Sequence, residues 1–277
     1  MKRILSIQDI SCLGKCSLTV ALPIISAMGV ETCIIPTAVL STHTMFSGFT
    51  FKDLTDQIEP IIAHWKASQI DFDAIYTGYL GSLEQIDLVM GIFEAFGRND
   101  NQIIVDPVIG DNGKIYPALN MDFAQGMKKL CGKADIILPN LTEAALMTGR
   151  EYRDIYDESY VKDMLKALAE LGSRVCVLTG ISLTEDKMGI MGYDREKDVF
   201  FNYYNKRYPM VCHGTGDIYA SVCVGALMNG KSVEDSFAIA VDYTAETIRL
   251  TAEDPQHRTY GVNFEAAIPY LLQRLEQ

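Results

Sequence analysis

The feature that most constrains the fold is a series of short apolar runs that alternate with helix-like stretches. The runs occupy residues 3–7, 30–35, 74–76, 102–105, 136–138 and 174–178. The central ones are continuously apolar, which is typical of strands buried on both faces of a parallel sheet. Helical spacing at residues 17–28, 54–67, 83–96 and 160–171 separates them. Repeated strand–helix–strand units, and therefore an α/β fold with a mostly parallel sheet, are predicted.

The pattern changes after Thr179. Residues 187–193 and 199–204 flank a charged turn and predict an antiparallel hairpin at the edge of the sheet. Helices are predicted at residues 217–228, 233–251 and 264–275. Pro36 is expected to end the second strand, because proline cannot donate to a sheet. The sequence contains no linker and no internal repeat, so we expect one domain over residues 1–277.

Composition excludes several classes of protein. The 277 residues carry 24 Lys and Arg against 36 Asp and Glu, a net charge of −12, which disfavours nucleic acids and anionic membranes as partners. The longest uncharged stretch, residues 32–51, holds five Thr and two Ser and does not read as a membrane span. The seven Cys show no metal-ligand spacing, and no signal peptide is recognisable, so we expect reduced thiols and a cytoplasmic protein.

Polar residues follow the apolar runs. Ligands of open parallel sheets bind beyond the carboxyl ends of the strands, so these residues are predicted to line a cleft of acids, amides and hydroxyls. They are Gln8-Asp9, Thr77-Gly78-Tyr79, Asp106-Pro107, Pro139-Asn140 with Glu143, and Thr179-Gly180.

The strongest local motif is His-Gly-Thr-Gly-Asp at residues 213–217, directly before a predicted helix. Two glycines and the first N–H groups of a helix form an anion-binding hole. A carboxylate beside such a hole suits phosphoryl transfer, in which Asp217 takes the proton of the attacking hydroxyl. The chain has no Walker A sequence, and no Gly-x-Gly-x-x-Gly follows the first strand.

Six motifs, in order along nearly the whole chain, resemble those of the pyridoxal kinases of the ribokinase-like superfamily. They are residues 4–8, Ser-Thr-His-Thr at 41–44, Gly-Tyr-Leu-Gly-Ser at 78–82, Asp-Pro-Val-Ile-Gly-Asp at 106–111, Pro139-Asn140 with Glu143, and Gly-Thr-Gly-Asp at 214–217. The resemblance implies a three-layer αβα sandwich. It also implies ATP-dependent phosphorylation of the 5′-hydroxymethyl group of a vitamin B6 vitamer.

The resemblance assigns roles residue by residue. Asp217 would be the catalytic base. The remaining roles are anion-hole amides at Gly214, Thr215 and Gly216; Mg²⁺, water and phosphate contacts at Asp106, Asn140 and Glu143; phosphate or flap contacts at Asp111 and Tyr116; the ATP side at Thr179; and the pyridine ring at Thr37, His43 and Tyr79. The edge hairpin and residues 203–212 would cover the nucleotide. Lys206 and Arg207 are candidates for contacting the phosphates of the nucleotide.

Three positions depart from the family pattern. Asp9-Ile10 stands where relatives commonly carry Ser-His, and Thr42 stands where they carry Asn. A carboxylate at Asp9 could pair with a pyridinium N–H or an amine, which favours pyridoxamine or pyridoxine over pyridoxal. His213, directly before Gly-Thr-Gly, resembles the motif of the hydroxymethylpyrimidine kinases. Those enzymes, however, often carry Cys where this chain has Asp217.

Two alternatives stay open. One is a hydroxymethylpyrimidine kinase of thiamin synthesis, and the other is a non-catalytic protein that binds a B6 vitamer or a nucleotide. By analogy with relatives that lack a lid, we expect a homodimer. A monovalent cation such as K⁺ near Asp106 or Thr179 is expected on the same footing.

Overall fold

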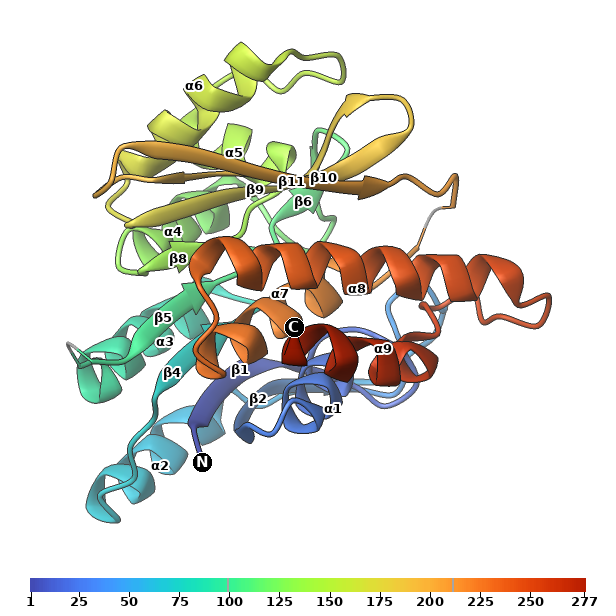
Figure 1. The fold of residues 1–277 in the computed structure, drawn as a ribbon. Coiled ribbons are helices and arrows are strands. Elements are labelled where there is room, and N and C mark those ends of the chain that lie inside the picture. The colour runs from blue at the N-terminus through green and yellow to red at the C-terminus, as the bar shows by residue number, and fades with distance from the viewer. Residues whose placement is uncertain (99, 211) are drawn as a thin grey trace.

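The computed structural model describes residues 1–98, 100–210 and 212–277, and these residues contain a nine-stranded sheet (Figure 1). The strand order is β11-β10-β9-β8-β5-β4-β1-β2-β3. The strands are β1 (Arg3–Ser11), β2 (Glu31–Leu40), β3 (Phe51–Asp53), β4 (Ala74–Thr77), β5 (Gln102–Val105), β8 (Ile136–Ile137), β9 (Val175–Thr184), β10 (Lys187–Asp194) and β11 (Val199–Lys206). A separate hairpin joins β6 (Gly110–Asp111) to β7 (Lys114–Ile115). The six central strands are parallel, as predicted.

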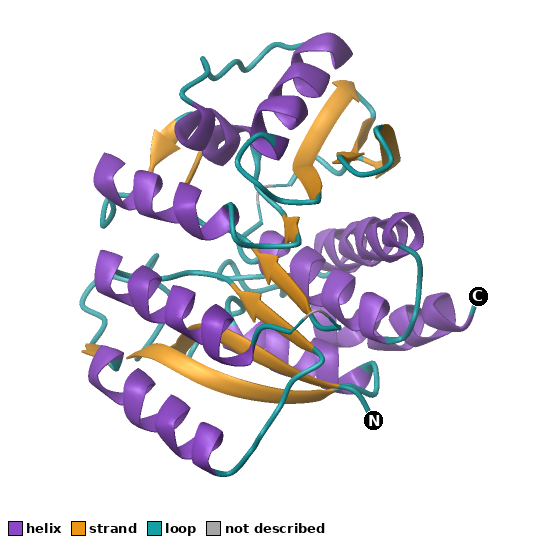
Figure 2. Cartoon of the chain, turned by 90° about the vertical axis from the view of Figure 1, so that its left-hand side faces the viewer, coloured by secondary structure: helices purple, strands orange, loops and turns teal. Residues whose placement is uncertain are grey.

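Helices cover both faces of the sheet, and Figure 2 shows the strands as a layer between them. One face carries α2 (Thr55–Ala67), α3 (Leu83–Phe96), α4 (Met121–Cys131), α5 (Leu141–Thr148) and α6 (Glu158–Ala169). The other face carries α1 (Leu18–Ala27), α7 (Thr215–Met228), α8 (Val233–Glu253) and α9 (Phe264–Glu276). The expected three-layer sandwich is confirmed. Because these helices pack on one sheet, we propose that residues 1–277 form one domain.

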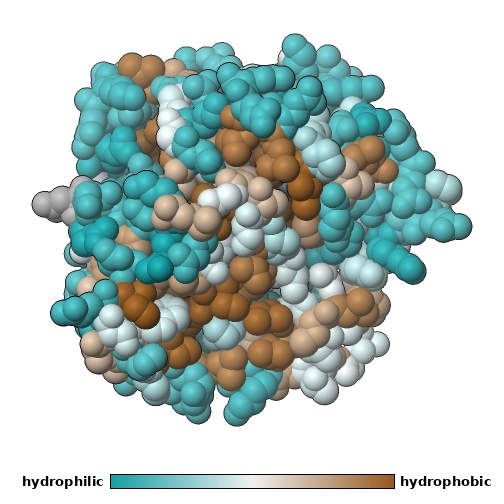
Figure 3. Space-filling model, turned by 60° about the horizontal axis from the view of Figure 1, so that its bottom comes forward, coloured by the Kyte–Doolittle hydropathy of each residue, from teal (hydrophilic) through white to brown (hydrophobic). Residues whose placement is uncertain are grey.

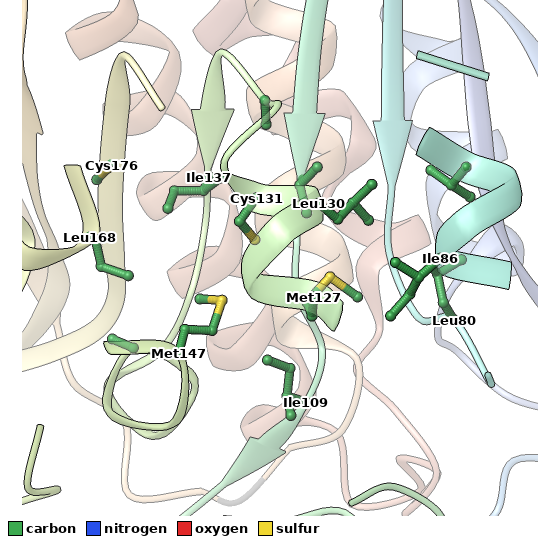
Figure 4. Packing of buried hydrophobic residues seen from close by; sticks show 14 of the residues in the cluster. Leu80, Ile86, Ile109, Met127, Leu130, Cys131, Ile137, Met147, Leu168 and Cys176 are labelled. Atoms are coloured by element: carbon green, nitrogen blue, oxygen red, sulfur yellow. The ribbon is translucent and has the colours of Figure 1, made fainter. Parts of the chain in front are cut away.

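The continuous apolar runs have a simple origin in this layering. Successive residues of a strand point to opposite faces, so Ile136 packs on the α7–α8 side while Ile137 packs on the α4–α5 side. Figure 4 shows Ile137 next to Cys131 of α4, within the cluster of buried apolar side chains. Both faces are buried, and a polar residue at either position would lose its hydration.

The end of the second strand was predicted wrongly. The second strand does not stop at Pro36 but continues to Leu40. The outer strand β3 pairs only with residues 38–40 of β2, so Pro36 lies where β2 is still an edge strand. A proline at an edge removes no hydrogen bond from the interior of the sheet.

The hairpin prediction is confirmed, since β10 and β11 pair antiparallel at one edge. The strand before it is longer than predicted, because β9 continues past Thr179 to Thr184 to pair with β10.

Helix α4 was not predicted. Its interior Gly126 weakens helical propensity, but a Cβ there would lie 2.8 Å from a methyl of Leu83, so glycine lets α3 and α4 approach. None of the helices in the described ranges is long and apolar enough to cross a membrane.

Candidate functional site

A cavity of about 650 Å³ opens beyond the carboxyl ends of β5, β8 and β9, beside the start of α7. It gathers every residue that the sequence assigned to catalysis, metal or nucleotide. Those residues are Asp106, Asp111, Tyr116, Asn140, Glu143, Thr179, Gly214, Thr215, Gly216 and Asp217. Lys206 and Arg207 also line it. The prediction that these residues converge is therefore confirmed, whereas their individual roles remain predictions.

Asp217 lies in the first turn of α7, which begins at Thr215 after Gly214. Gly214 is left-handed, with φ 77°, and a Cβ on it would lie 1.9 Å from the carbonyl oxygen of Lys15. Only glycine fits there without moving the backbone. The first N–H groups of a helix lack intrahelical partners, and here they begin at a residue that lines the cavity. Burial raises the pKa of Asp217 to about 7, Asp9 adds to the rise, and a backbone hydrogen bond from Ser17 opposes it.

Asn140 and Glu143 form a capping box at the start of α5. The Asn140 side chain accepts from the Glu143 N–H at 2.9 Å, and a Glu143 carboxylate oxygen accepts from the Asn140 N–H at 2.9 Å. The other Glu143 oxygen accepts from the N–H of Ile109 at 2.9 Å, and the Asn140 amide donates to the Gly110 carbonyl at 2.9 Å. These bonds tie α5 to the segment that follows β5. Burial nevertheless raises the pKa of Glu143 to about 7.

Asp106 follows β5 directly and is 8% exposed. Burial raises its pKa well above the ordinary value, and the charges of Glu143 and Asp217 add to the rise. A backbone hydrogen bond from Val108 opposes the shift. Val108 has φ 43°, which is unusual for a β-branched residue. This strained turn therefore presents an amide to Asp106 and places the next amide, that of Ile109, against Glu143.

The acid pair fits Mg²⁺ better than a closed metal cage. Within the described ranges, no cluster of three or more His, Cys, Asp or Glu side chains could hold a metal ion by itself. Mg²⁺ keeps several waters and binds through one or two carboxylates together with substrate phosphates. The charge of Glu143 raises the pKa of Asp106, because like charges disfavour ionisation, and a bound cation would favour the ionised carboxylates.

The residues predicted to face the pyridine ring do not line this cavity. One of them, Asp9, raises the pKa of Asp217, so this second side of the site meets the cavity at Asp217. Asp9 is 5% exposed near the end of β1, and burial raises its pKa. The register of β1 and β2 shifts between Gln8 and Ile10, so that Asp9 stands opposite Thr37 and Ala38 at a β-bulge. The Asp9 charge reaches Tyr79, whose pKa is raised by burial first and by Asp9 second.

His43 connects the two sides. Its ring centroid lies 5.1 Å from that of His213, which lines the cavity. His43 Nδ1 accepts from the Met45 N–H at 3.1 Å, so this nitrogen is the unprotonated one. Burial lowers the pKa of His43, and the neighbouring His213 lowers it further.

Sequence reasoning missed the helical wall of the cavity. Val241, Thr244, Ala245 and Ile248 of α8 line it. Their spacing of i, i+3, i+4 and i+7 was visible in the sequence, but it is equally the spacing of a core-facing helix. Of the stretch 203–212 that was predicted to cover the nucleotide, residues 206–210 and Cys212 line the cavity, and Val211 lies outside the described residues.

Known proteins resemble this chain over nearly its whole length. The family model described as phosphomethylpyrimidine kinase matches residues 22–263. A solved Bacteroides thetaiotaomicron protein, named as a candidate phosphomethylpyrimidine kinase, gives a TM-score of 0.94 at 37% identity and covers 98% of this chain and 93% of that one. An orthorhombic form under the same name, with pyridoxal, gives a TM-score of 0.92.

Pyridoxal kinases match as well. The solved enzyme from Lactobacillus plantarum has a TM-score of 0.90 at 30% identity and covers 99% of this chain and 97% of that one. The curated pyridoxal kinase PdxY of Actinobacillus pleuropneumoniae is 28% identical over 292 residues, 98% of this chain and 96% of its own length.

Proposed function

The chain belongs to the phosphomethylpyrimidine kinase family and, within it, to the pyridoxal kinases, and from this premise we propose its reaction. The γ-phosphoryl group of ATP is transferred to the 5′-hydroxymethyl group of pyridoxal, pyridoxamine or pyridoxine, which gives the 5′-phosphate. The observation that carries the proposal is the half-buried Asp217 at the start of α7, with its pKa raised to about 7 at the wall of a cavity large enough for a nucleotide.

The mechanism follows from the positions of the side chains. Asp217, in its ionised form, accepts the proton of the vitamer hydroxyl as that oxygen attacks phosphorus. The amides of Gly214, Thr215 and Gly216 donate to the oxygens of the transferred group, and the helix dipole favours negative charge at the same point. The α8 wall from Val241 to Ile248 contacts the base of the nucleotide, while Lys206 and Arg207 approach its phosphates.

Mg²⁺ would be held by Asp106 and Glu143 through direct or water-mediated contacts. When bound, it neutralises charge on the phosphates. The capping box of Asn140 and Glu143 fixes the orientation of one of these carboxylates. A monovalent cation near Asp106 or Thr179 is part of the same proposal, and its check is the transfer rate with K⁺ exchanged for Na⁺.

The test is ATP-dependent phosphate transfer to pyridoxal, pyridoxamine, pyridoxine and hydroxymethylpyrimidine. Transfer to a B6 vitamer is expected, with a loss of roughly 10²–10⁴-fold in Asp217→Asn. Asp194→Asn changes a buried carboxylate outside the cavity and controls for misfolding. Transfer only to hydroxymethylpyrimidine would favour the second candidate, which the name of the matched family supports. Binding without transfer in the wild type would identify a binding protein instead.

We also propose a cytoplasmic homodimer. The seven cysteines are free, which suits a reducing compartment. Figure 3 shows apolar side chains gathered on one face of the molecule. Large exposed apolar residues near the β3 edge include Leu13, Met45, Phe49 and Phe51, and a second copy would cover them. Sedimentation should give twice the chain mass of 30.8 kDa, and Phe51→Asp should shift the equilibrium to monomer.

A further inference from the structure

Ser17, the residue before α1, has a backbone conformation that serine rarely adopts. Its φ is 50° and its ψ is −132°, and its side chain is buried. A left-handed backbone is costly for any residue with a Cβ, and it persists only where the surrounding structure enforces it. Strain at a buried position beside a functional site points to a task that a relaxed backbone would not perform.

Ser17 contacts two carboxylates at once. Its hydroxyl donates to Oδ1 of Asp9 at 2.6 Å. Its backbone N–H lies close enough to the carboxylate of Asp217 to lower the pKa of that group. Because both donors belong to one residue, the positions of the two acids relative to each other are fixed by the short path through the Ser17 Cα and Cβ atoms.

Such a link matters because the charge of Asp9 acts on Asp217. In the described part of the chain, no basic side chain is among the groups that act on Asp9 or Asp217. Their like charges repel, and water screens the repulsion only partly because Asp9 is buried and Asp217 is half-buried. The left-handed turn at Ser17 aims one donor at each of them, which is the reason we infer for its strain.

The loop that carries Ser17 is anchored on two sides. Lys15 Nζ lies 2.7 Å from a carboxylate oxygen of Glu265 and 5.5 Å from the ring centroid of Phe264, both in α9. On the other side, the Lys15 carbonyl lies against Gly214 at the start of α7. Ser17 therefore cannot follow a shift of either acid without disturbing α7 or α9.

We propose that Ser17 is a positioning residue for phosphoryl transfer. It holds Asp9 and Asp217 so that an acceptor bound at Asp9 presents its hydroxyl to Asp217. This inference rests on the proposed kinase function, because it presupposes that Asp217 accepts the proton of the acceptor.

The decisive variants are Ser17→Gly and Ser17→Ala. Glycine keeps the backbone N–H and adopts a positive φ freely, so only the hydroxyl is lost. We expect kcat with a B6 vitamer to fall roughly tenfold, the effect of a lost hydrogen bond to a charged group, while KM for ATP changes less than about twofold. Alanine should show the same loss of kcat with a lower thermal midpoint than glycine, because it keeps the strain.

Gln69→Gly is the matched control. Gln69 also has a positive φ, 55°, but it is exposed at the end of α2, away from the site. Its kcat should equal that of the wild type.

A double-mutant cycle separates positioning from a structural role. In an Asp9→Asn background, Ser17→Gly should cost much less than in the wild type, since the two residues act as a unit. An unchanged kcat in Ser17→Gly would overturn the role of Ser17. So would a lower kcat accompanied by a higher KM for ATP and a lower thermal midpoint, because these changes together indicate a general structural defect. A wild-type chain that transfers phosphate to no vitamer would instead defeat the proposed function itself.

Discussion

The two sides of Asp217 are built in different ways. On the nucleotide side, Asp106, Asn140 and Glu143 follow the ends of adjacent parallel strands, and backbone hydrogen bonds fix them. On the acceptor side, Asp9 faces a β-bulge and His43 lies in a loop. Under the proposed function, the sheet provides a rigid frame for phosphates, whereas bulge and loop residues, which vary without disturbing a fold, select the acceptor.

The largest expected effect comes from the point where the two sides meet. Gly214→Ala places a Cβ 1.9 Å from the Lys15 carbonyl at a φ of 77°. The left-handed backbone costs about 1–2 kcal/mol, and the displaced loop should lower kcat by roughly 10²-fold because the base moves. Thermal unfolding and steady-state kinetics measure both.

Gly230→Ala is the control for that variant. Gly230 has φ 79°, but a Cβ there meets nothing within 4 Å. The Gly230→Ala variant should have a lower thermal midpoint than the wild type but the same kcat. Equal kcat in the two variants would show that the contact of Gly214 with Lys15 does not affect the reaction.

The nucleotide side can be loosened through Glu143. Glu143→Gln places an NH₂ group against backbone N–H donors, and an unsatisfied buried polar group costs about 1–3 kcal/mol. We expect a roughly tenfold lower rate at limiting Mg²⁺, partly restored at high Mg²⁺. Glu158 is an exposed acid in the first turn of α6. Glu158→Gln should change neither the rate at limiting Mg²⁺ nor its response to added Mg²⁺. Identical Mg²⁺ titrations for Glu143→Gln and the wild type would contradict a metal role on this side.

The pH dependence should reflect Asp217. Its pKa of about 7 predicts that the rate falls roughly tenfold for each pH unit below 7, since the base must be ionised. The acid limb should vanish from the residual rate of Asp217→Asn. A wild-type rate that is flat from pH 5.5 to pH 8 would argue against Asp217 as the base.

Asp217 should also affect stability in the opposite sense to an ordinary acid. Its folded pKa of about 7 exceeds the ordinary value of 3.8, so the folded state holds the extra proton between them. Stability therefore falls as pH rises through this window. Thermal midpoints measured from pH 5 to pH 8 should fall more steeply in the wild type than in Asp217→Asn.

The acceptor side gives the smallest and most selective effect. Asp9→Ser or Asp9→Asn removes the carboxylate that is placed to meet a cationic group of the vitamer. The ratio of kcat/KM for pyridoxamine to that for pyridoxal should fall roughly tenfold, as expected for one charged hydrogen bond. An unchanged ranking of the three vitamers would remove Asp9 from substrate selection.

The difference between strand-end residues and residues of bulges, loops and strained turns also explains which parts of the site the sequence could predict. Asp106, Asn140 and Glu143 were found because apolar runs mark strands, and the ends of parallel strands meet at one edge. Ser17 and Val108 could not be found, since nothing in a sequence marks a positive φ at a non-glycine residue. The spacing of the α8 residues that line the cavity was visible in the sequence, but the same spacing is typical of a core-facing helix and did not indicate a site. The continuation of β2 through Pro36 depends on how short β3 is, which is a property of the assembled sheet.

Asp9 and Asp217 lie roughly 200 residues apart, a long-range pairing of the kind that forms late in folding. During translation, the loop that carries Ser17 leaves the ribosome long before α7. With Asp217 as the proposed base, a nascent chain that lacks α7 has no base near Asp9 and is expected to transfer no phosphate from ATP. Catalytic activity in this protein therefore reports that synthesis has passed α7 and that the two distant segments have met.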